Sequence, residues 1–210
     1  MPFPRPLSPE ADVSDLASWL TEWSLFYPSD YDEKLLKVAR PPAGGFVLRD
    51  LKIIIGWKSE VRFVRSRQLQ VQRYDAAHPG AILRSTTAAL TAAGDAAALQ
   101  ALRGIPNFQR PAFGSALLMV ADPDRWTTFD RMANESLVRL RDTLAVRRRG
   151  DPLHDVCRLL GAFRPNRVGN NYPAQAADWP IYMECCRAIS TVTWLSLRTR
   201  DRALFEARGR

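Results

Sequence analysis

Apolar residues recur at intervals of three and four along most of the chain, which is the spacing of helices that bury one face. The pattern predicts helices over these ranges: 15–26, 31–39, 46–72, 81–93, 96–103, 112–121, 131–144, 155–163 and 181–206. The run Ile53–Ile55 leaves a strand as a lesser alternative within the third range. Ser14 and Asp95 stand where each would cap the helix that follows it. The sequence therefore predicts an all-α fold.

The sequence predicts one domain, because nothing on the N-terminal side is long enough to bury a core alone. We expect the proline-rich residues 1–12 to be a flexible segment and residues 13–210 to be a single helical domain. Within that domain, residues 46–145 form the central part and residues 180–207 a closing helix. Residues 164–180 are predicted to be the longest irregular segment, and loops of this length often carry function.

The stretch 102–121 predicts a helical hairpin. Gly104 ends one helix, and Asn107 suits a tight turn that needs an unusual backbone angle. Pro111 stands where proline is tolerated, in the first turn of the next helix. Residues 112–121 are apolar nearly all round, so we expect that helix to be buried.

The hairpin leads into an extended segment and a third helix. Asp122–Pro123 ends the buried helix, because a residue before proline is pushed out of the helical region. Residues 126–129 are predicted to be extended, and Asp130 is placed to cap the helix over 131–144. From its position alone, Asp130 has the plain role of a helix cap, which contributes about 1 kcal/mol of stability.

The order of turn, buried helix and aspartate resembles the helix–hairpin–helix DNA glycosylase superfamily and is nearest in pattern to its 8-oxoguanine branch. The family turn has the form Leu-Pro-Gly-Val-Gly, and residues 105–109 here read Ile-Pro-Asn-Phe-Gln. Residues 117–130 match, without a gap, the run that leads to the family's catalytic aspartate. The resemblance covers residues 46–145 and implies a helix–hairpin–helix glycosylase-like helical domain.

The resemblance also implies the residues of a site. It places the catalytic aspartate at Asp130 and a base pocket at Trp57, whose ring would stack on a base. The implied DNA contacts are a phosphate anchor in the turn and a wedge that fills the gap left by a flipped base: Asn107, Phe108, Gln109 and Arg110 for the anchor, Lys58, Ser59 and Arg62 for the wedge. Plainer interpretations stay open. Trp57 would then be a core anchor, the hairpin an ordinary packing unit and the arginines a solvated face.

Two departures from the family pattern bear on the chemistry. Asn107 and Gln109 stand where the family prefers glycine, and Pro111 stands where its bifunctional members place a lysine nucleophile. Proline has no primary amine, so strand cleavage through a Schiff base at that position is excluded. Lys58 could take that role only from another wall of the site and as the unprotonated amine. The resemblance thus implies a monofunctional glycosylase, in which a carboxylate stabilises the sugar cation and water attacks.

Composition and charge favour a polyanionic partner. The chain contains 30 Lys and Arg against 22 Asp and Glu, so its net charge is +8, carried almost wholly by arginine. Arginine makes bidentate contacts with phosphate, and double-stranded DNA is therefore the expected partner. The alternative is that the arginine reflects a GC-rich genome, which the alanine and proline content also fits. The hydrophobic share of 46% is enough for a core.

The remaining chemistry-bearing residues predict no metal, cofactor or disulfide. Cys157, Cys185 and Cys186 are odd in number, and His78 and His154 stand alone, so neither a disulfide framework nor an iron–sulfur cluster is expected. The start lacks an apolar targeting core, and no apolar run approaches membrane-spanning length. We expect a cytoplasmic protein that works at the bacterial nucleoid and contacts no membrane.

The first functional hypothesis is a base-excision glycosylase of DNA repair, a hydrolase that acts on N-glycosyl bonds. Two other functions fit the same sequence. A non-catalytic protein that binds duplex DNA on the same scaffold would account for the missing glycines of the turn. In the third hypothesis, the chain is a helical protein-interaction module, and its high arginine content reflects composition and has no role in binding DNA.

Overall fold

The computed structural model describes residues 4–33, 35, 38, 44–165 and 172–207, and most of these residues are helical and none lies in a strand, which confirms the all-α prediction. The helices are α1 (Val13–Ser24), α2 (Ser29–Glu33), α3 (Leu48–Lys58), α4 (Val61–Ala77), α5 (Ala81–Thr91), α6 (Asp95–Ala101), α7 (Pro111–Ala121), α8 (Arg131–Thr143), α9 (His154–Ala162), α10 (Tyr172–Thr193) and α11 (Leu197–Glu206). The predicted helix over 31–39 overlaps only α2, and most of its remaining residues lie outside the described ranges.

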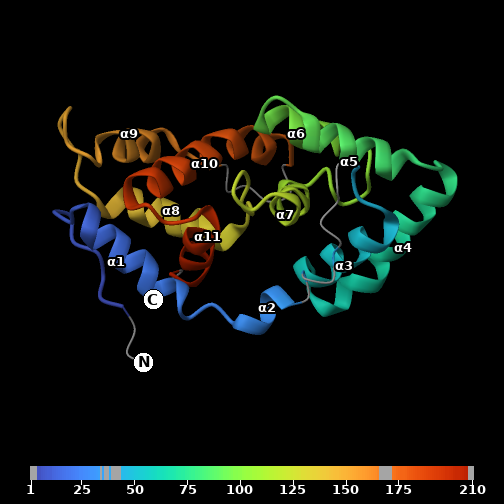
Figure 1. Ribbon diagram of the computed structural model, residues 1–210, viewed down its shortest axis with the longest axis horizontal. Coiled ribbons are helices and arrows are strands. Elements are labelled where there is room, and N and C mark those ends of the chain that lie inside the picture. The colour runs from blue at the N-terminus through green and yellow to red at the C-terminus, as the bar shows by residue number, and fades with distance from the viewer. Residues whose placement is uncertain (1–3, 34, 36–37, 39–43, 166–171, 208–210) are drawn as a thin grey trace.

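The helices form two halves that meet around α7 (Figure 1). One half contains α3, α4, α5 and α6, and the other contains α1, α8, α9, α10 and α11. Helix α7 packs against α3, α5, α6 and α10, so it contacts both halves. The buried apolar residues form one continuous cluster that runs through both halves.

The hairpin between α6 and α7 contains the predicted turn. Asn107 takes the left-handed conformation, with a φ of 71°, and asparagine is one of the few residues that tolerate it. Pro111 occupies the first turn of α7, where its missing N–H costs nothing. Residues 113–120 of α7 are all buried. The predicted turn and the predicted buried helix are therefore confirmed.

Two predicted helix caps are wrong. The N-cap of α1 is Asp12, whose carboxylate accepts hydrogen bonds from both the backbone N–H and the hydroxyl of Ser14. The N-cap position of α6 is Gly94, and Asp95 is the first residue of the helix. The carboxylate of Asp95 instead binds the guanidinium of Arg187 in a bidentate pair, which is stronger than a single cap hydrogen bond.

Two long predicted helices are each divided. The predicted helix over 46–72 is α3 followed by α4, separated by Ser59 and Glu60 with ψ angles of 146° and 141°. The predicted closing helix over 180–207 is the end of α10 followed by α11, and Trp194 between them has a φ of 57°. Neither break contains glycine or proline, the residues that usually indicate the end of a helix, so the sequence did not predict it.

Most of the described residues of the predicted irregular segment over 164–180 are helical. Residues 166–171 lie outside the described ranges, and α10 then runs through Pro180. Trp179 and Tyr182 on either side of this proline are completely buried. Their burial compensates for the backbone hydrogen bond that proline cannot donate.

The basic turn at 147–149 holds the N-terminal segment. A terminal nitrogen of Arg147 donates to the carbonyl oxygens of Pro9 and Ala11 at 3.1 and 2.6 Å. Its side chain is 13% exposed, while Arg148 and Arg149 are exposed. Arg147 is thus a structural residue, and its guanidinium is not available on the surface to bind phosphate.

Gly114 allows α7 to approach the turn closely. A Cβ atom at this position would lie 2.4 Å from Leu99 Cδ1 and 3.0 Å from the carbonyl oxygen of Phe108. Both distances are shorter than side-chain contacts normally allow. The carbonyl belongs to the hairpin turn itself, so it can move only if the turn changes shape.

Gly114→Ala is therefore expected to lower the free energy of unfolding by about 1–3 kcal/mol, as overpacking a core does. Gly161→Ala in α9 is the matched control, because no atom lies within 4 Å of the added Cβ. That change should raise stability by about 0.5–1 kcal/mol, since alanine favours the helix over glycine. Urea denaturation measures both. A Gly114→Ala variant as stable as the wild type would contradict the close approach of α6 and α7.

Candidate functional site

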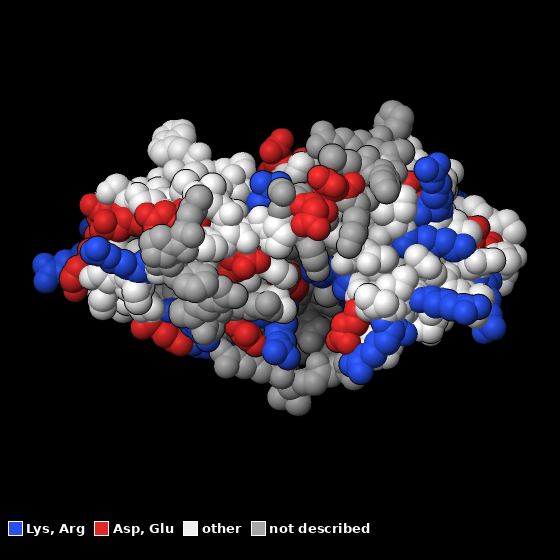
Figure 2. Space-filling model, turned by 90° about the horizontal axis from the view of Figure 1, so that it is seen from below, with Lys and Arg blue, Asp and Glu red and all other residues white. Residues whose placement is uncertain are grey.

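A cavity of about 330 Å³ lies between residues of the two halves, a volume typical of small-ligand sites. The α3–α4 corner, the start of α8, helix α11 and the residues after α1 contribute its walls. On the face shown in Figure 2, the surface is hollowed between the two halves. The lining residues are Tyr27, Trp57, Lys58, Ser59, Glu60, Thr128, Asp130, Arg131, Met132, Arg198, Asp201 and Phe205.

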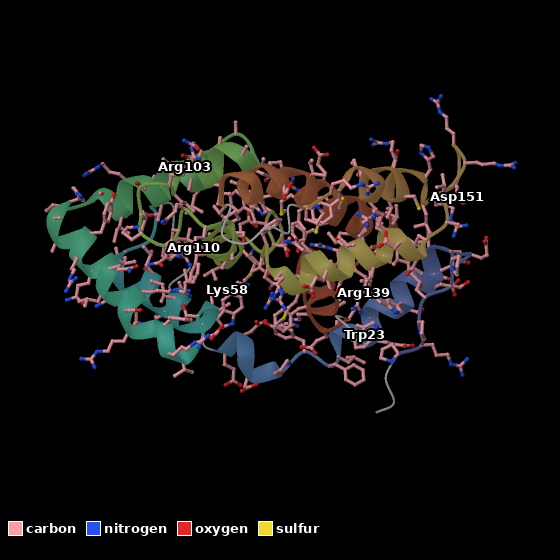
Figure 3. All side chains as sticks on the ribbon, turned by 180° about the vertical axis from the view of Figure 1, so that it is seen from behind. Trp23, Lys58, Arg103, Arg110, Arg139 and Asp151 are labelled. Atoms are coloured by element: carbon pink, nitrogen blue, oxygen red, sulfur yellow. The ribbon has the colours of Figure 1, made fainter. Side chains whose placement is uncertain are left out.

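Lys58 and Asp130 meet in this cavity from different halves (Figure 3 labels Lys58). Lys58 is the last residue of α3, and its Nζ lies 3.0 Å from Oδ2 of Asp130. The other oxygen of Asp130 accepts a hydrogen bond from the backbone N–H of Ala133 at 2.9 Å, which confirms the predicted cap of α8. The two charged side chains are 13% and 12% exposed. The pair is therefore mostly shielded from water, yet it borders the cavity.

Buried hydrogen bonds hold the extended segment before Asp130. The backbone N–H of the preceding residue donates to the hydroxyl of Ser115 in α7 at 2.7 Å. The Tyr182 hydroxyl donates to the carbonyl oxygen of Thr128 at 2.8 Å. The Thr128 hydroxyl in turn donates to Asp201 of α11 at 2.9 Å. Helices α7, α10 and α11 therefore fix where the Asp130 carboxylate lies.

A second ionic network forms another wall of the cavity. Arg198 donates to the carboxylates of Asp201 and Asp32 and to the hydroxyl of Tyr27. Arg202 donates to the same carboxylate of Asp32 at 2.6 Å. These contacts tie Asp32 of α2 and Tyr27, between α1 and α2, to α11, and Tyr27, Arg198 and Asp201 line the cavity on that side.

Burial and charge act in opposite directions in this network. Burial alone would raise the pKa of Asp32, but the attraction of Arg198 and Arg202 outweighs it and holds the pKa below its ordinary value. Burial would lower the pKa of Arg198, but the neighbouring Asp201 and Asp32 raise it. Both carboxylate and guanidinium therefore stay charged at neutral pH.

The contribution of Asp32 to stability is expected to disappear in acid. Because its folded pKa is lowered, the contribution is fully present above the unfolded value of 3.8 and is lost as the pH falls through the folded value. The free energy of unfolding should thus fall more steeply below about pH 4 for the wild type than for Asp32→Asn. Urea denaturation across that range measures the slopes, and parallel curves for the two proteins would contradict the stabilised carboxylate.

The predicted phosphate anchor is only partly available. Phe108 is completely buried, and the buried side chain of Asn107 donates to Gln70 at 3.2 Å. The backbone N–H groups of Phe108 and Arg110 donate to carbonyl oxygens within the turn. Gln109 is exposed, and its backbone N–H makes no hydrogen bond within the described part of the chain. The side chains of Asn107 and Phe108 are thus core residues, so in this turn only backbone N–H groups and the exposed positions could contact a phosphate.

The three predicted wedge residues have different surroundings. Lys58 is held in its ion pair, and the hydroxyl of Ser59 accepts a hydrogen bond from Arg67 at 3.0 Å. Arg62 pairs with Glu60 at 2.8 Å and is 72% exposed. Of the three, only Arg62 is on the open surface.

Trp57 is a core residue with one edge in the cavity wall. It is 6% exposed and belongs to the buried apolar cluster, which favours the plainer interpretation of this residue as an anchor. The Nζ of Lys58 lies 5.2 Å from its ring centroid, so the ring also borders the ion pair. Its exposed edge is too small to serve as a stacking platform alone.

Positive charge gathers on α3 and α4. Residues 48–77 contain seven Lys or Arg and three Asp or Glu, a net charge of +4, which is half the net charge of the chain. Figure 2 shows Lys and Arg side chains spread over the right-hand half of that face, the half that contains α3 and α4 in Figure 1. One side of the hollow is therefore markedly basic.

Several residues of the cavity wall were not predicted as site residues. Arg198, Asp201 and Phe205 come from the predicted closing helix, which was described only by its apolar face. Their spacing of three and four places them on one side of α11, and that spacing was a usable signal. Tyr27 carried no signal, since it stands in a break between helices.

Among the described residues, no group of three or more His, Cys, Asp and Glu could hold a metal ion. No helix within the described ranges has the length and apolarity to cross a membrane. Cys185 and Cys186 are buried, and burial raises their pKa values to about 12 and about 11, so both thiols are protonated at neutral pH.

No family model, no curated protein sequence and no solved structure matches the chain.

Proposed function

We propose that the protein is a base-excision DNA glycosylase that removes a flipped, damaged or modified base by hydrolysis. The observation that carries the proposal is the Asp130 carboxylate, which caps α8 and lines the cavity between the two halves. The basic surface of α3 and α4 supports duplex DNA as the partner, because clustered arginine and lysine side chains bind the phosphate backbone.

The proposed reaction needs a carboxylate beside the sugar. Breaking an N-glycosidic bond develops positive charge at C1′ and the ring oxygen, and a carboxylate held nearby stabilises that charge. Ala133 fixes one oxygen of Asp130 and Lys58 the other, so the group is oriented before the reaction begins. A water molecule then attacks C1′, and the free base and an abasic site are the products.

The cavity suits a planar ring. Trp57, Met132 and Phe205 supply apolar surface, and Tyr27 adds a third aromatic residue, whose ring lies 5.8 Å from that of Phe205. Aromatic faces accept any base, while the buried Thr128 and the ionic network supply polar groups. A base inside the duplex stack cannot reach such a site, so the proposal requires it to be flipped out.

Lys58 is a positioning residue in this proposal. Its ammonium group is paired with Asp130, and a protonated amine has no lone pair with which to attack C1′. Pro111, where bifunctional members of the resembled family place their lysine, has no amine. The mechanism is therefore hydrolytic, without a covalent bond between protein and DNA.

Asp130→Asn is expected to reduce base release by about 100-fold or more, because the stabilising charge is lost while asparagine still caps α8. The substitution also leaves the Lys58 ammonium without its anionic partner and so lowers stability, and thermal denaturation verifies that the variant is folded under the assay conditions. The assay incubates the protein with duplexes that carry oxidised, alkylated or deaminated bases and then cleaves abasic sites with alkali. Asp124→Asn, at an exposed carboxylate in the turn after α7, is the matched control and should keep full activity.

Two results would overturn the proposed mechanism. One is full activity in Asp130→Asn. The other is a protein–DNA adduct trapped with borohydride from the wild type, because a hydrolytic reaction forms no Schiff base.

A non-catalytic DNA-binding protein is the second candidate, and the ion pair is the observation that favours it. A carboxylate already neutralised by Lys58 stabilises a neighbouring cation less than a free one. This function requires duplex binding that weakens with salt and no base release from any substrate. Asp130→Asn would then bind duplex DNA as the wild type does, whereas Arg65→Glu on the exposed face of α4 would bind it more weakly.

A further inference from the structure

A separate cavity of about 510 Å³ lies between the end of α8 and helix α9. Helix α8 has 13 residues, so at about 1.5 Å per residue this cavity lies about 20 Å along the helix from Asp130. Among the described residues, it shares no lining side chain with the cavity beside Asp130. We call it the α8–α9 cavity, and it is large enough for a small ligand.

Basic side chains dominate the charged part of its lining. Among the described residues that line it, the acidic one is Asp142 and the basic ones are Arg141, Arg147, His154, Arg158 and Arg164. Four guanidinium groups around one cavity repel one another, and a single carboxylate neutralises only one of them. A bound anion would relieve this repulsion, so the charge of the cavity favours an anionic ligand.

Two of the guanidinium groups have free donors. Among the described residues, Arg158 contacts Asp155 through Nε alone, at 3.3 Å, and its side chain is 61% exposed. Arg164 is exposed, and its guanidinium makes no hydrogen bond or ion pair within the described part of the chain. Each therefore offers two terminal nitrogens in the planar arrangement that matches the oxygens of a phosphate group.

The other two arginines are anchored to the protein. Arg141 donates through Nε to Asp142 at 2.7 Å and through Nη1 to the carbonyl oxygen of Phe163 at 3.1 Å. A guanidinium has five N–H groups, so these bonds orient Arg141 and leave donors for a ligand. Arg147 is held by the N-terminal segment, so it adds positive charge to the cavity without contacting a ligand directly.

The remaining surface of the cavity is largely apolar. Leu144, Val146 and Leu160 line it, and Val146 is 96% exposed. Inorganic phosphate alone would leave most of this surface unused. A phosphate attached to an aromatic or apolar group would use both kinds of surface, and guanidinium groups also stack on aromatic rings.

We propose that the α8–α9 cavity binds a phosphate monoester that carries an aromatic or apolar group, as a nucleoside monophosphate does. Arg158 and Arg164 bind the phosphate, Arg141 contacts it from the wall of the cavity, and the apolar residues pack against the attached group. A monoester phosphate carries a charge of about −1.5 to −2 at neutral pH, whereas each phosphate inside a DNA strand carries a single charge. The excess of arginine therefore favours the monoester. Two sources carry this chemistry, a free nucleotide and the 5′ end of a DNA strand.

Isothermal titration calorimetry with the full-length protein tests the site, in a buffer without phosphate or sulfate. The titrants are adenosine monophosphate, adenosine and inorganic phosphate. Adenosine monophosphate should bind at least about tenfold more tightly than either of the others, because it alone uses both the arginines and the apolar surface. Arg158→Ser/Arg164→Ser should weaken its binding at least about tenfold, because two charge-assisted contacts are lost.

Arg139→Ser is the matched control, because Arg139 is an exposed arginine of α8 outside the cavity lining (Figure 3). This variant loses the same charge and should bind adenosine monophosphate within about twofold of the wild type, since it loses no contact with the ligand. Arg158→Ser alone alters an exposed side chain and should weaken binding about threefold or more. Thermal denaturation verifies the fold of each variant.

Competition separates the two sources of the phosphate. A DNA strand that displaces adenosine monophosphate with a 5′ phosphate, and fails to do so with a 5′ hydroxyl, would identify strand ends as the ligand. Failure of both strands to displace it would identify the free nucleotide.

Three results would overturn the site. They are equal displacement by both strands, equal binding of adenosine and its monophosphate, and wild-type affinity in the double variant. None of these measurements depends on base release, so the site and the glycosylase are tested separately.

Discussion

The ion pair between Lys58 and Asp130 is the contact on which the site depends. It joins the end of α3 to the start of α8 and so crosses the boundary between the two halves. Because both side chains are mostly shielded from water, removing one partner would leave the other charge poorly solvated, which is strongly destabilising. The pair therefore fixes how the α3–α4 corner lies against α8, and with it the shape of the cavity.

The hairpin and the cap of α8 were predictable because the constraints there are local. Asn107 satisfies a left-handed turn, Pro111 starts a helix, and Asp130 accepts a hydrogen bond three residues ahead. The helix breaks at Ser59 and Trp194 were not predictable from composition. Each interrupts an apolar periodicity that continues on both sides, so the direction of the chain there depends on packing between distant helices.

The partners of the charged residues could not be predicted from the sequence either, because they are distant along the chain. Lys58 and Asp130 are separated by 72 positions along the chain. Asp95 and Arg187, whose ion pair replaces the predicted cap, are separated by 92. Periodicity indicates which side of a helix is buried but does not indicate what that side faces. For the same reason Trp57 was a candidate stacking residue by sequence, while its position in the core depends on α3 packing against α4 and α7.

The distribution of charge bears on which substrate the cavity would take. Its lining contains three basic and three acidic side chains, and the principal pairs neutralise each other, so the cavity itself carries little net charge. The adjacent α3 and α4 carry a net +4. A near-neutral cavity disfavours a ligand that is charged throughout, while a basic rim attracts a polyanion. A nucleotide within DNA combines the two properties, because its uncharged base is attached to a charged backbone. A free anion would be attracted by the basic rim but would gain nothing from the near-neutral cavity. A protein partner would need neither the cavity nor the excess of arginine.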